Sequence, residues 1–398
     1  MGHGSLQQEA RMVPRPGQRR ALGSTARAKP AYCDRREADG KVAAVKLTRL
    51  ELHRFTAFEN AVFDFASGVN VVIGENGTGK SHVLKLVYCL NESVRRYKSN
   101  EGLDASPREL DEILTEMLVS VFQPDELHRL VRRGIGRRKA RIAVTWSDGR
   151  KQRQLGITLT SLGRLTIDGD DDLPTLERSV FLPTREVLSI FPGFIASYQR
   201  RESSFDRTFY DLCVALDAKP LRGPRDAKRA RLLAPIEEVL GGRVVNENGR
   251  FYLKLSDGDM EAPLVAEGLR KLGMLAYLIL NGSLSENGFL LWDEPEASMN
   301  PRLTKLTGDV VLGLARSGVQ TVLATHDYLL TSELTLSVEQ QHSGGAAFFA
   351  LGRSPKRNGT FIERGERLSQ LQENAILAAM AALHDRETQA FAAGASGD

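Results

Sequence analysis

Apolar positions along the chain follow two different periods, and together they predict an α/β fold. Short apolar runs bounded by turn residues are typical of buried strands. Longer stretches with an apolar residue at every third or fourth position predict helices. Buried strands are expected at 69–73, 289–292 and 319–324, and helices at 82–90, 109–133, 268–280 and 368–392.

Two further regions add detail to this fold. Residues 44–65 and 139–170 alternate between apolar and polar positions, and the second of them contains Asp-Gly turns, which predicts an antiparallel β subdomain. An aromatic-rich block at about 185–240 predicts a helical lobe, and 241–259 reads as a hairpin. We therefore expect one domain over 45–398.

The first 44 residues differ from the rest of the chain. They carry 9 Lys/Arg against 4 Asp/Glu and show little apolar periodicity, which predicts a disordered basic tail at 1–44. Two interpretations of this tail remain open: a leader without function or an over-called start site, and a segment that attaches electrostatically to an acidic partner. The tail holds the excess positive charge, so the net charge of +4 does not by itself indicate nucleic-acid binding.

Composition excludes several classes of protein. At 398 residues and 41% apolar content, the chain can bury a large core. The three cysteines lie far apart, which argues against a disulfide framework or a zinc site and favours the reducing cytoplasm. No apolar run approaches the roughly 20 residues of a membrane span, so no membrane-spanning segment is expected.

The stretch "VVIGENGTGKSHVLKL" carries the first candidate chemistry. It fits G-x-x-x-x-G-K-[ST] and lies between a predicted strand and a predicted helix, as a phosphate-binding loop does. Its glycines let backbone N–H groups converge on phosphates, Lys80 can reach the β/γ oxygens, and the Ser81 hydroxyl can ligate Mg²⁺. The predicted nucleotide-binding residues are Gly74, Glu75, Asn76, Gly77, Thr78, Gly79, Lys80 and Ser81.

A second candidate follows the apolar strand in "GFLLWDEPEASMNP". Asp293 and Glu294 stand directly at the end of this strand. Such a pair suits two tasks, because one carboxylate can hold Mg²⁺ while the other polarises the attacking water. We assign the metal to Asp293, together with Ser81, and water activation to Glu294.

A third strand end presents polar side chains in "VQTVLATHDYLL". His326 follows this strand, and an imidazole there can hydrogen-bond the γ-phosphate and respond to its presence. A strand-end histidine is more often structural. As the third polar strand end in one chain, His326 is predicted to be a catalytic switch.

These three stretches, in this order, resemble an ABC-type ATPase head, and more closely the RecF, OLD and SMC branch of P-loop NTPases. Matching residues are sparse over 45–390 as a whole, and the match is specific only at the motifs. It implies an ABC-type head with ATP and Mg²⁺ as cofactors. It also implies a homodimer, in which a partner's "LSxGx" segment completes each nucleotide site.

The resemblance places four further elements. Ala266, Glu267 and Gly268 occupy the signature-like position that would act in trans, with alanine where the family has serine. A glycine N–H can still donate to a phosphate there, but Ala266 supplies no hydroxyl, so slow hydrolysis is expected. Asn300 resembles the loop that crosses between subunits. Arg54 and Phe55 would lie near the base or ribose.

Absent features narrow the function. The chain lacks the Asn-Lys-x-Asp segment that favours guanine, the long heptads of SMC arms and, after His326, enough residues for the nuclease domain of OLD proteins. Resemblance to ATPase subunits of anti-phage and abortive-infection systems implies regulation of a separate effector, a nuclease or toxin. The alternatives are a RecF-like ATP-gated DNA-binding protein in repair, and an ATP-binding switch that scarcely hydrolyses.

Overall fold

The computed structural model describes Met1 and residues 44–100, 107–170, 172–223, 225–341, 345–353 and 359–395. The chain divides into two units, Met1–Val42 and Ala43–Asp398. The predicted basic tail lies almost wholly outside the described residues. All of the architecture below therefore belongs to the second unit.

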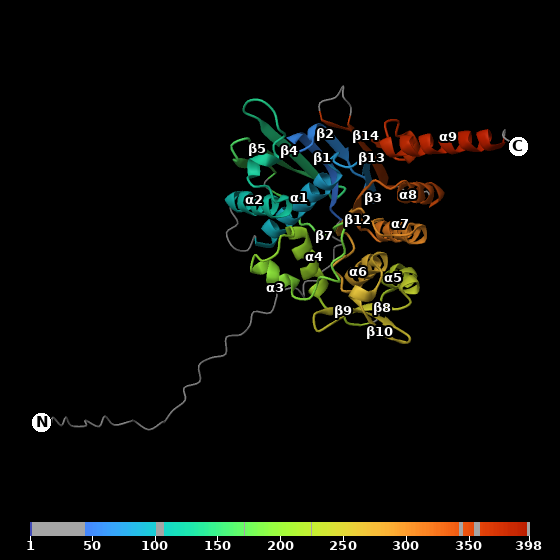
Figure 1. The fold of residues 1–398 in the computed structure, drawn as a ribbon. Coiled ribbons are helices and arrows are strands. Elements are labelled where there is room, and N and C mark those ends of the chain that lie inside the picture. The colour runs from blue at the N-terminus through green and yellow to red at the C-terminus, as the bar shows by residue number, and fades with distance from the viewer. Residues whose placement is uncertain are drawn as a thin grey trace. The chain divides into compact units, whose positions relative to one another are not determined.

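A six-stranded sheet of order β14-β13-β3-β12-β11-β7 forms the centre of this unit (Figure 1). Strands β13, β3, β12, β11 and β7 run parallel, and β14 pairs antiparallel to β13 at one edge. Their bounds are β3 Val69–Gly74, β7 Ser179–Leu182, β11 Phe289–Asp293, β12 Gln320–Thr325, β13 Ala346–Arg353 and β14 Thr360–Gly365. The first four are buried throughout, which fits their mainly apolar sequences.

Helices cover both faces of the central sheet. In Figure 1, α1 and α2 lie on one side of β3 and β12, and α7 and α8 lie on the other. Alternate residues of β3 accordingly enter different cores, with Val71 and Ile73 in one and Val72 in the other. The helix bounds are α1 Lys80–Asn100, α2 Pro107–Phe122, α6 Glu267–Leu280, α7 Pro301–Arg316 and α8 Tyr328–Gln341.

An antiparallel sheet of order β2-β1-β4-β5-β6 packs beside α1 and α2. It contains the alternating segments recognised in the sequence, with the Asp148–Gly149 turn between β4 and β5. Its strands are β1 Lys46–Phe55, β2 Phe58–Asp64, β4 Lys139–Ser147, β5 Gln152–Thr160 and β6 Leu165–Gly169. The predicted α/β fold with an antiparallel β subdomain is confirmed.

The region predicted as a helical lobe contains α3, α4 and α5, and a small sheet follows it. This sheet has three strands rather than the predicted hairpin, because the chain turns again at Ser256 and Asp257 and pairs a third strand with the second. The bounds are α3 Phe194–Gln199, α4 Arg207–Asp217, α5 Ala227–Leu240, β8 Arg243–Glu247, β9 Arg250–Leu255 and β10 Gly258–Glu261. A short 3₁₀ turn, Ala262–Leu264, then leads into α6.

Two predicted helices have different bounds in the structure. The helix expected at 109–133 ends at Phe122, because Gln123 adopts a positive φ of 49° and is followed by Pro124, which cannot continue a helix; a short 3₁₀ turn, Leu127–Leu130, follows. The helix expected at 368–392 begins as α9, Ala375–Ala395, because the Asn374 side chain accepts from the N–H groups of Ile376 and Leu377.

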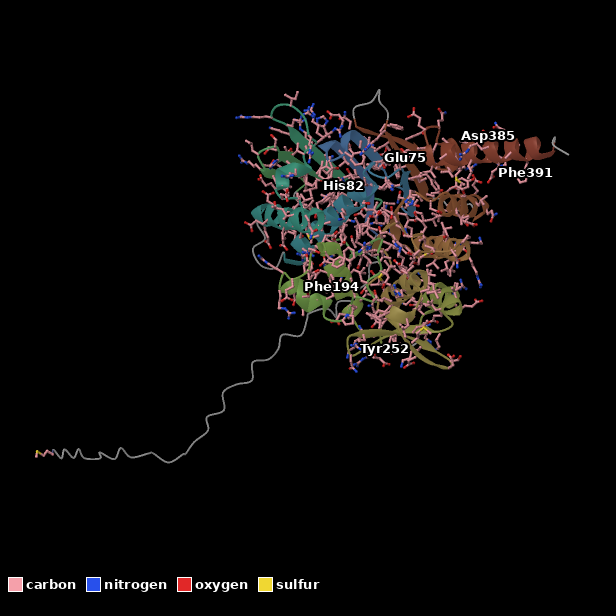
Figure 2. The ribbon with its side chains drawn as sticks, viewed as in Figure 1. Glu75, His82, Phe194, Tyr252, Asp385 and Phe391 are labelled. Atoms are coloured by element: carbon pink, nitrogen blue, oxygen red, sulfur yellow. The ribbon has the colours of Figure 1, made fainter. Side chains whose placement is uncertain are left out.

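Helix α9 extends away from the central sheet (Figure 1), and Figure 2 shows Asp385 and Phe391 on its outer part. The residues of α9 from Ala378 to Phe391 are exposed. Within the described part of the chain, no helix is both long enough and apolar enough to cross a bilayer.

Candidate functional site

Three parallel strands of the central sheet have their carboxyl-terminal ends side by side, and the predicted site residues follow these ends. We call this end of the sheet the site edge. Strand β3 leads into the loop at Gly74, β11 ends at Asp293, and β12 ends one residue before His326. The strands are neighbours in register, with Asp293 beside Ala324 and Thr325 beside Ile73. Segments about 200 residues apart therefore meet at a single edge, where ligands bind in α/β folds.

Lys80 lies folded over the phosphate-binding loop. Its ammonium donates to the carbonyl oxygens of Gly74 at 2.7 Å and Glu75 at 3.1 Å, and the residue is 6% exposed. Burial lowers the pKa of Lys80, while the carboxylates of Glu294 and Asp293 oppose this shift. The carboxylates at the end of β11 therefore attract the ammonium group of Lys80.

The loop depends on glycine at a close approach to the antiparallel sheet. Gly79 has a φ of +104°, and a Cβ there would lie 2.8 Å from the Phe58 ring. Two side chains from β13, the neighbour of β3, and from β14, the strand beside β13, also brace the loop. Thr360 donates to the Thr78 carbonyl at 2.8 Å, and Arg353 donates to the Gly77 carbonyl. Sequence reasoning missed both braces, because neither belongs to a motif.

Asp293 and Ser81 have the chemistry of a magnesium site. The Ser81 hydroxyl hydrogen-bonds the Asp293 carboxylate, and burial raises the pKa of that carboxyl. The residue is 9% exposed, and among the described residues its buried Oδ1 has no hydrogen-bond partner. Hydroxyl and carboxylate oxygens are ligands that Mg²⁺ accepts. An unpartnered buried oxygen beside the loop serine therefore fits a bound Mg²⁺ ion.

Glu294 and His326 lie within hydrogen-bonding distance. His326 Nδ1 is 3.2 Å from Glu294 Oε1, and the histidine side chain is about half exposed. Glu294 adopts a left-handed φ of 49°, and its N–H donates to the Ala324 carbonyl at 2.8 Å. Because that carbonyl belongs to β12, the backbone of Glu294 is attached to the strand that precedes His326.

A third carboxylate, which sequence reasoning left without a role, lies behind this pair. Glu296 is 8% exposed and accepts a 2.6 Å hydrogen bond from the Thr325 hydroxyl. Its Oε1 is 3.9 Å from His326 Nδ1, and burial raises its pKa. The signal in the sequence was a further acidic residue two positions after Glu294, in "DEPE".

The signature-like segment forms the first turn of α6. Ala266 is the N-cap residue; it is exposed and accepts no side-chain capping bond. Glu267 is half-buried, and Gly268 is buried against its own chain, since a Cβ there would lie 2.7 Å from the Ser298 carbonyl. The contact between Gly268 and Ser298 was not expected from the sequence.

Asn300 has a clear local role. Its side chain accepts from the Leu303 N–H at 3.0 Å and caps α7, with Pro301 in the first turn. Asn300 is exposed, and its position in a subunit-crossing loop stays a prediction.

Phe55 is buried at the end of β1. Its side chain has no exposed surface, and its ring packs edge to face on Phe122 with centroids 5.9 Å apart. The ring is covered by Phe122, and the position of Phe55 near the base or ribose stays a prediction. Arg54 is more accessible, but its guanidinium pairs with Glu59 at 3.0 Å.

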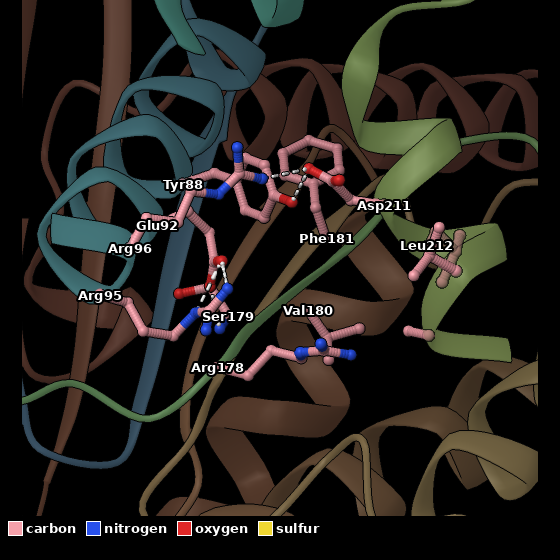
Figure 3. Close-up of a pocket in the computed structure, with 12 residues that line it drawn as sticks. Tyr88, Glu92, Arg95, Arg96, Arg178, Ser179, Val180, Phe181, Asp211 and Leu212 are labelled. Atoms are coloured by element: carbon pink, nitrogen blue, oxygen red, sulfur yellow. Dashed lines mark hydrogen bonds and ion pairs between the residues drawn. The ribbon is translucent and has the colours of Figure 1, made fainter. Parts of the chain in front are cut away.

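A small pocket on the far part of α1 is separate from this edge (Figure 3). Four of its charged groups form pairs: Arg95 with Glu92 at 2.8 Å, and Arg96 with Asp211 at 3.3 Å. The Tyr88 hydroxyl also donates to Asp211 at 2.8 Å. These contacts join α1 to α4, so the helix that follows the phosphate-binding loop is tied to the helical lobe.

The fold and the motifs at this edge define an ABC-type P-loop ATPase of the RecF/SMC kind. The family described as "AAA domain, putative AbiEii toxin, Type IV TA system" matches residues 69–332, more than half of the chain. This span includes the phosphate-binding loop, Asp293, Glu294 and His326. The chain belongs to this family.

Curated relatives are similar over short segments. The DNA replication and repair protein RecF of Pediococcus pentosaceus is 40% identical over 58 residues, which cover 15% of each chain. RecF of Chloroherpeton thalassium is 34% identical over 74 residues, covering 18% of this chain and 20% of the relative. The chain thus spans about a fifth or less of the length of these relatives.

Solved structures share the fold. An SMC head bound to the C-terminal winged-helix domain of ScpA is 12% identical with a TM-score of 0.54, covering 81% of this chain and 98% of that one. A Pyrococcus furiosus Smc head bound to the C-terminal domain of ScpA is also 12% identical, with a TM-score of 0.50 and coverage of 86% and 100%.

Proposed function

We propose that this chain binds and hydrolyses Mg-ATP, dimerises around the nucleotide, and uses the bound state to regulate a separate effector. The observation that supports hydrolysis best is the convergence of Lys80, Asp293 and Glu294 with His326 at one sheet edge. Phosphoryl transfer to water requires a phosphate-binding group, a metal-binding carboxylate and a base at one place, and these residues can supply all three.

Each residue has a distinct task in this proposal. Lys80 and the loop N–H groups bind the β- and γ-phosphates, and Ser81 with Asp293 holds Mg²⁺. The ion would neutralise charge on the phosphate oxygens. Glu294 orients and polarises the attacking water, while His326 donates through its other ring nitrogen to the γ-phosphate.

The proposed dimer uses the exposed N-terminus of α6. Ala266 is exposed there, and the preceding Leu264 is 72% exposed although it is apolar. Helix N-termini favour anions, so a partner's γ-phosphate can be bound at this end of α6. Exposed apolar surface around such an end is also what an interface between two copies would bury.

Regulation of an effector, with a setting in anti-phage defence, is supported by the family description, which names a putative AbiEii toxin and a type IV toxin–antitoxin system. We propose that the effector is a separate nuclease or toxin. The cytoplasmic location stays a prediction.

The first experiment measures phosphate release from Mg-ATP by the purified chain, with Lys80→Ala as the inactive control. Turnover that is equal in both proteins would contradict the proposal. The second measures the affinity for a protein encoded beside this chain, in ATP and in ADP, because a regulator must bind its partner differently in the two states.

The matches to RecF favour one second candidate, an ATP-gated DNA-binding protein. In that case DNA should stimulate turnover and bind more tightly with ATP, while no neighbour-encoded protein binds. Salt-dependent affinity for duplex DNA, measured with and without ATP, separates the two functions.

A further inference from the structure

Lys271 lies beneath the turn that carries Glu294. This lysine, in the second turn of α6, has no exposed surface. Its ammonium donates to the Ala297 carbonyl at 2.8 Å and lies 3.5 Å from the Glu294 carbonyl. Both of these oxygens belong to residues 294–298, the first part of the connection between β11 and α7.

Gly268 provides a second contact between the same helix and the same turn. A Cβ at Gly268 would lie 2.7 Å from the Ser298 carbonyl, so the two backbones touch. Helix α6 therefore contacts both ends of the segment 294–298: Lys271 at Glu294 and Ala297, and Gly268 at Ser298.

The turn itself needs such support. Glu294 and Ser298 both have left-handed φ values, 49° and 66°, which side-chain-bearing residues rarely adopt. Residues in this region remain there only where the surrounding structure holds them. The contacts from α6 supply that restraint on one side, and the hydrogen bond from the Glu294 N–H to Ala324 supplies it on the other.

Packing alone does not require a lysine at position 271. A buried ammonium loses its hydration, which disfavours its charged form, and burial accordingly lowers the pKa of Lys271. The carboxylates of Glu267 and Glu296 favour the charged form. An apolar side chain of similar length would fill the same space without this penalty, so what the lysine adds is its bond to the turn.

We propose that Lys271 is a positioning residue that fixes the backbone of Glu294 and couples it to the N-terminus of α6. The proposal rests on the proposed function, in which Glu294 activates water and α6 faces a second copy. A displacement of α6 on dimer closure then reaches Glu294 through Lys271, so that hydrolysis follows closure within each subunit.

The test compares Lys271→Met with a matched control at the other end of the helix. Asn281, 5% exposed, ends α6 and donates to the carbonyls of Ala215 and Ala218. Asn281→Leu removes buried carbonyl contacts of the same kind, far from the turn. Both variants should unfold at lower temperature. Only Lys271→Met should lose about tenfold or more in kcat, while its KM and ATP affinity change less than threefold. The kcat of Lys271→Arg should lie between that of Lys271→Met and that of wild type.

Hydrogen exchange gives a readout that does not depend on turnover. Amides of 294–300 should exchange at least tenfold faster in Lys271→Met than in wild type, and at the wild-type rate in Asn281→Leu. If Lys271→Met does not fold, Lys271→Gln, which keeps a neutral donor, is compared with the same control.

Wild-type exchange and wild-type kcat in the Lys271 variants would overturn the inference. If the wild-type chain shows no turnover, the ATPase function and the coupling to hydrolysis are rejected. Faster exchange of 294–300 in Lys271→Met would still show that Lys271 holds this segment in place.

Discussion

His326 Nδ1 lies 3.2 Å from the Glu294 carboxylate, so the predicted switch residue and the candidate base form one unit. With Nδ1–H donated to Glu294, His326 must be in the imidazolium form for Nε2 to donate to the γ-phosphate as proposed. Glu296, 3.9 Å from the same nitrogen, stands behind the pair. The three side chains come from two adjacent strand ends, which lets a change at one strand reach both functional groups.

The Glu294→Gln variant should keep ATP affinity and lose at least about tenfold in turnover, equal to about 1.4 kcal/mol in the activation barrier. The amide keeps the size and the hydrogen bond to His326 but cannot polarise water as a carboxylate does. Asp293→Ala should instead weaken Mg-ATP binding itself. Nucleotide titration and phosphate release measure both effects, and equal turnover in Glu294→Gln and wild type would remove the role assigned to Glu294.

Two glycine-to-alanine variants should shift stability in opposite directions. Gly268→Ala places a Cβ 2.7 Å from the Ser298 carbonyl and should destabilise by about 1–3 kcal/mol, since backbone cannot move aside as a side chain does. Gly308→Ala, in α7, meets Leu334 at an ordinary 3.7 Å and should stabilise by up to about 1 kcal/mol. Urea unfolding of the two variants gives both signs, and turnover should fall only in Gly268→Ala, because that turn carries Glu294.

Lys46 should make a contribution to the free energy of unfolding that increases with pH above 8. Burial lowers the pKa of Lys46 from 10.5 to about 8, although its ammonium donates to the Gly318 carbonyl. Between these values the unfolded chain binds the additional proton, so the free energy of unfolding increases with pH. This contribution is at most about 3.5 kcal/mol, from about 1.4 kcal/mol per pKa unit.

Unfolding free energies at pH 7.5 and 10 measure this effect as a difference between variants. Lys46→Met should lack the increment that wild type shows. Lys139→Met, which changes an exposed lysine of β4, should retain it. Identical pH dependence in wild type and Lys46→Met would contradict the assignment.

The sequence predicted the fold and the motif residues because both depend on local patterns. Buried parallel strands read as continuous apolar runs, and the phosphate-binding loop has a fixed spacing. The burial of Phe55 was not predicted, because a residue at the end of β1 can face either the core or the site, and the sequence does not tell which face is covered. In the structure, Phe122 of α2 covers it.

The residues that sequence reasoning missed act through long-range contacts. Lys271 appears in the sequence as one polar position in an apolar helix, and its role depends on carbonyls 23 and 26 positions away. Arg353 and Thr360 brace the loop from strands 276 and 282 positions further along the chain. Such backbone acceptors carry no residue identity, so no sequence pattern marks them.

Ala266→Ser should act in two separable ways. Ala266 is an N-cap without a side-chain bond, and serine there can accept from the N–H of the second or third residue of α6. The gain should be about 1 kcal/mol in stability, the usual difference between serine and alanine at this position. Thermal unfolding without nucleotide measures this effect alone.

The second effect depends on the proposed dimer. A hydroxyl at the exposed end of α6 adds a donor for a partner's γ-phosphate, so Ala266→Ser combined with Glu294→Gln should form an ATP-dependent dimer at lower protein concentration than Glu294→Gln alone. Light scattering with ATP and with ADP measures the mass.

Ala266→Glu, which puts a carboxylate at the same exposed place, should prevent the ATP-dependent dimer by repelling the phosphate. Its acidic group stands at a helix N-terminus, so the monomer should stay folded. A single mass for all three proteins in both nucleotides would show that this end of α6 does not meet a second copy.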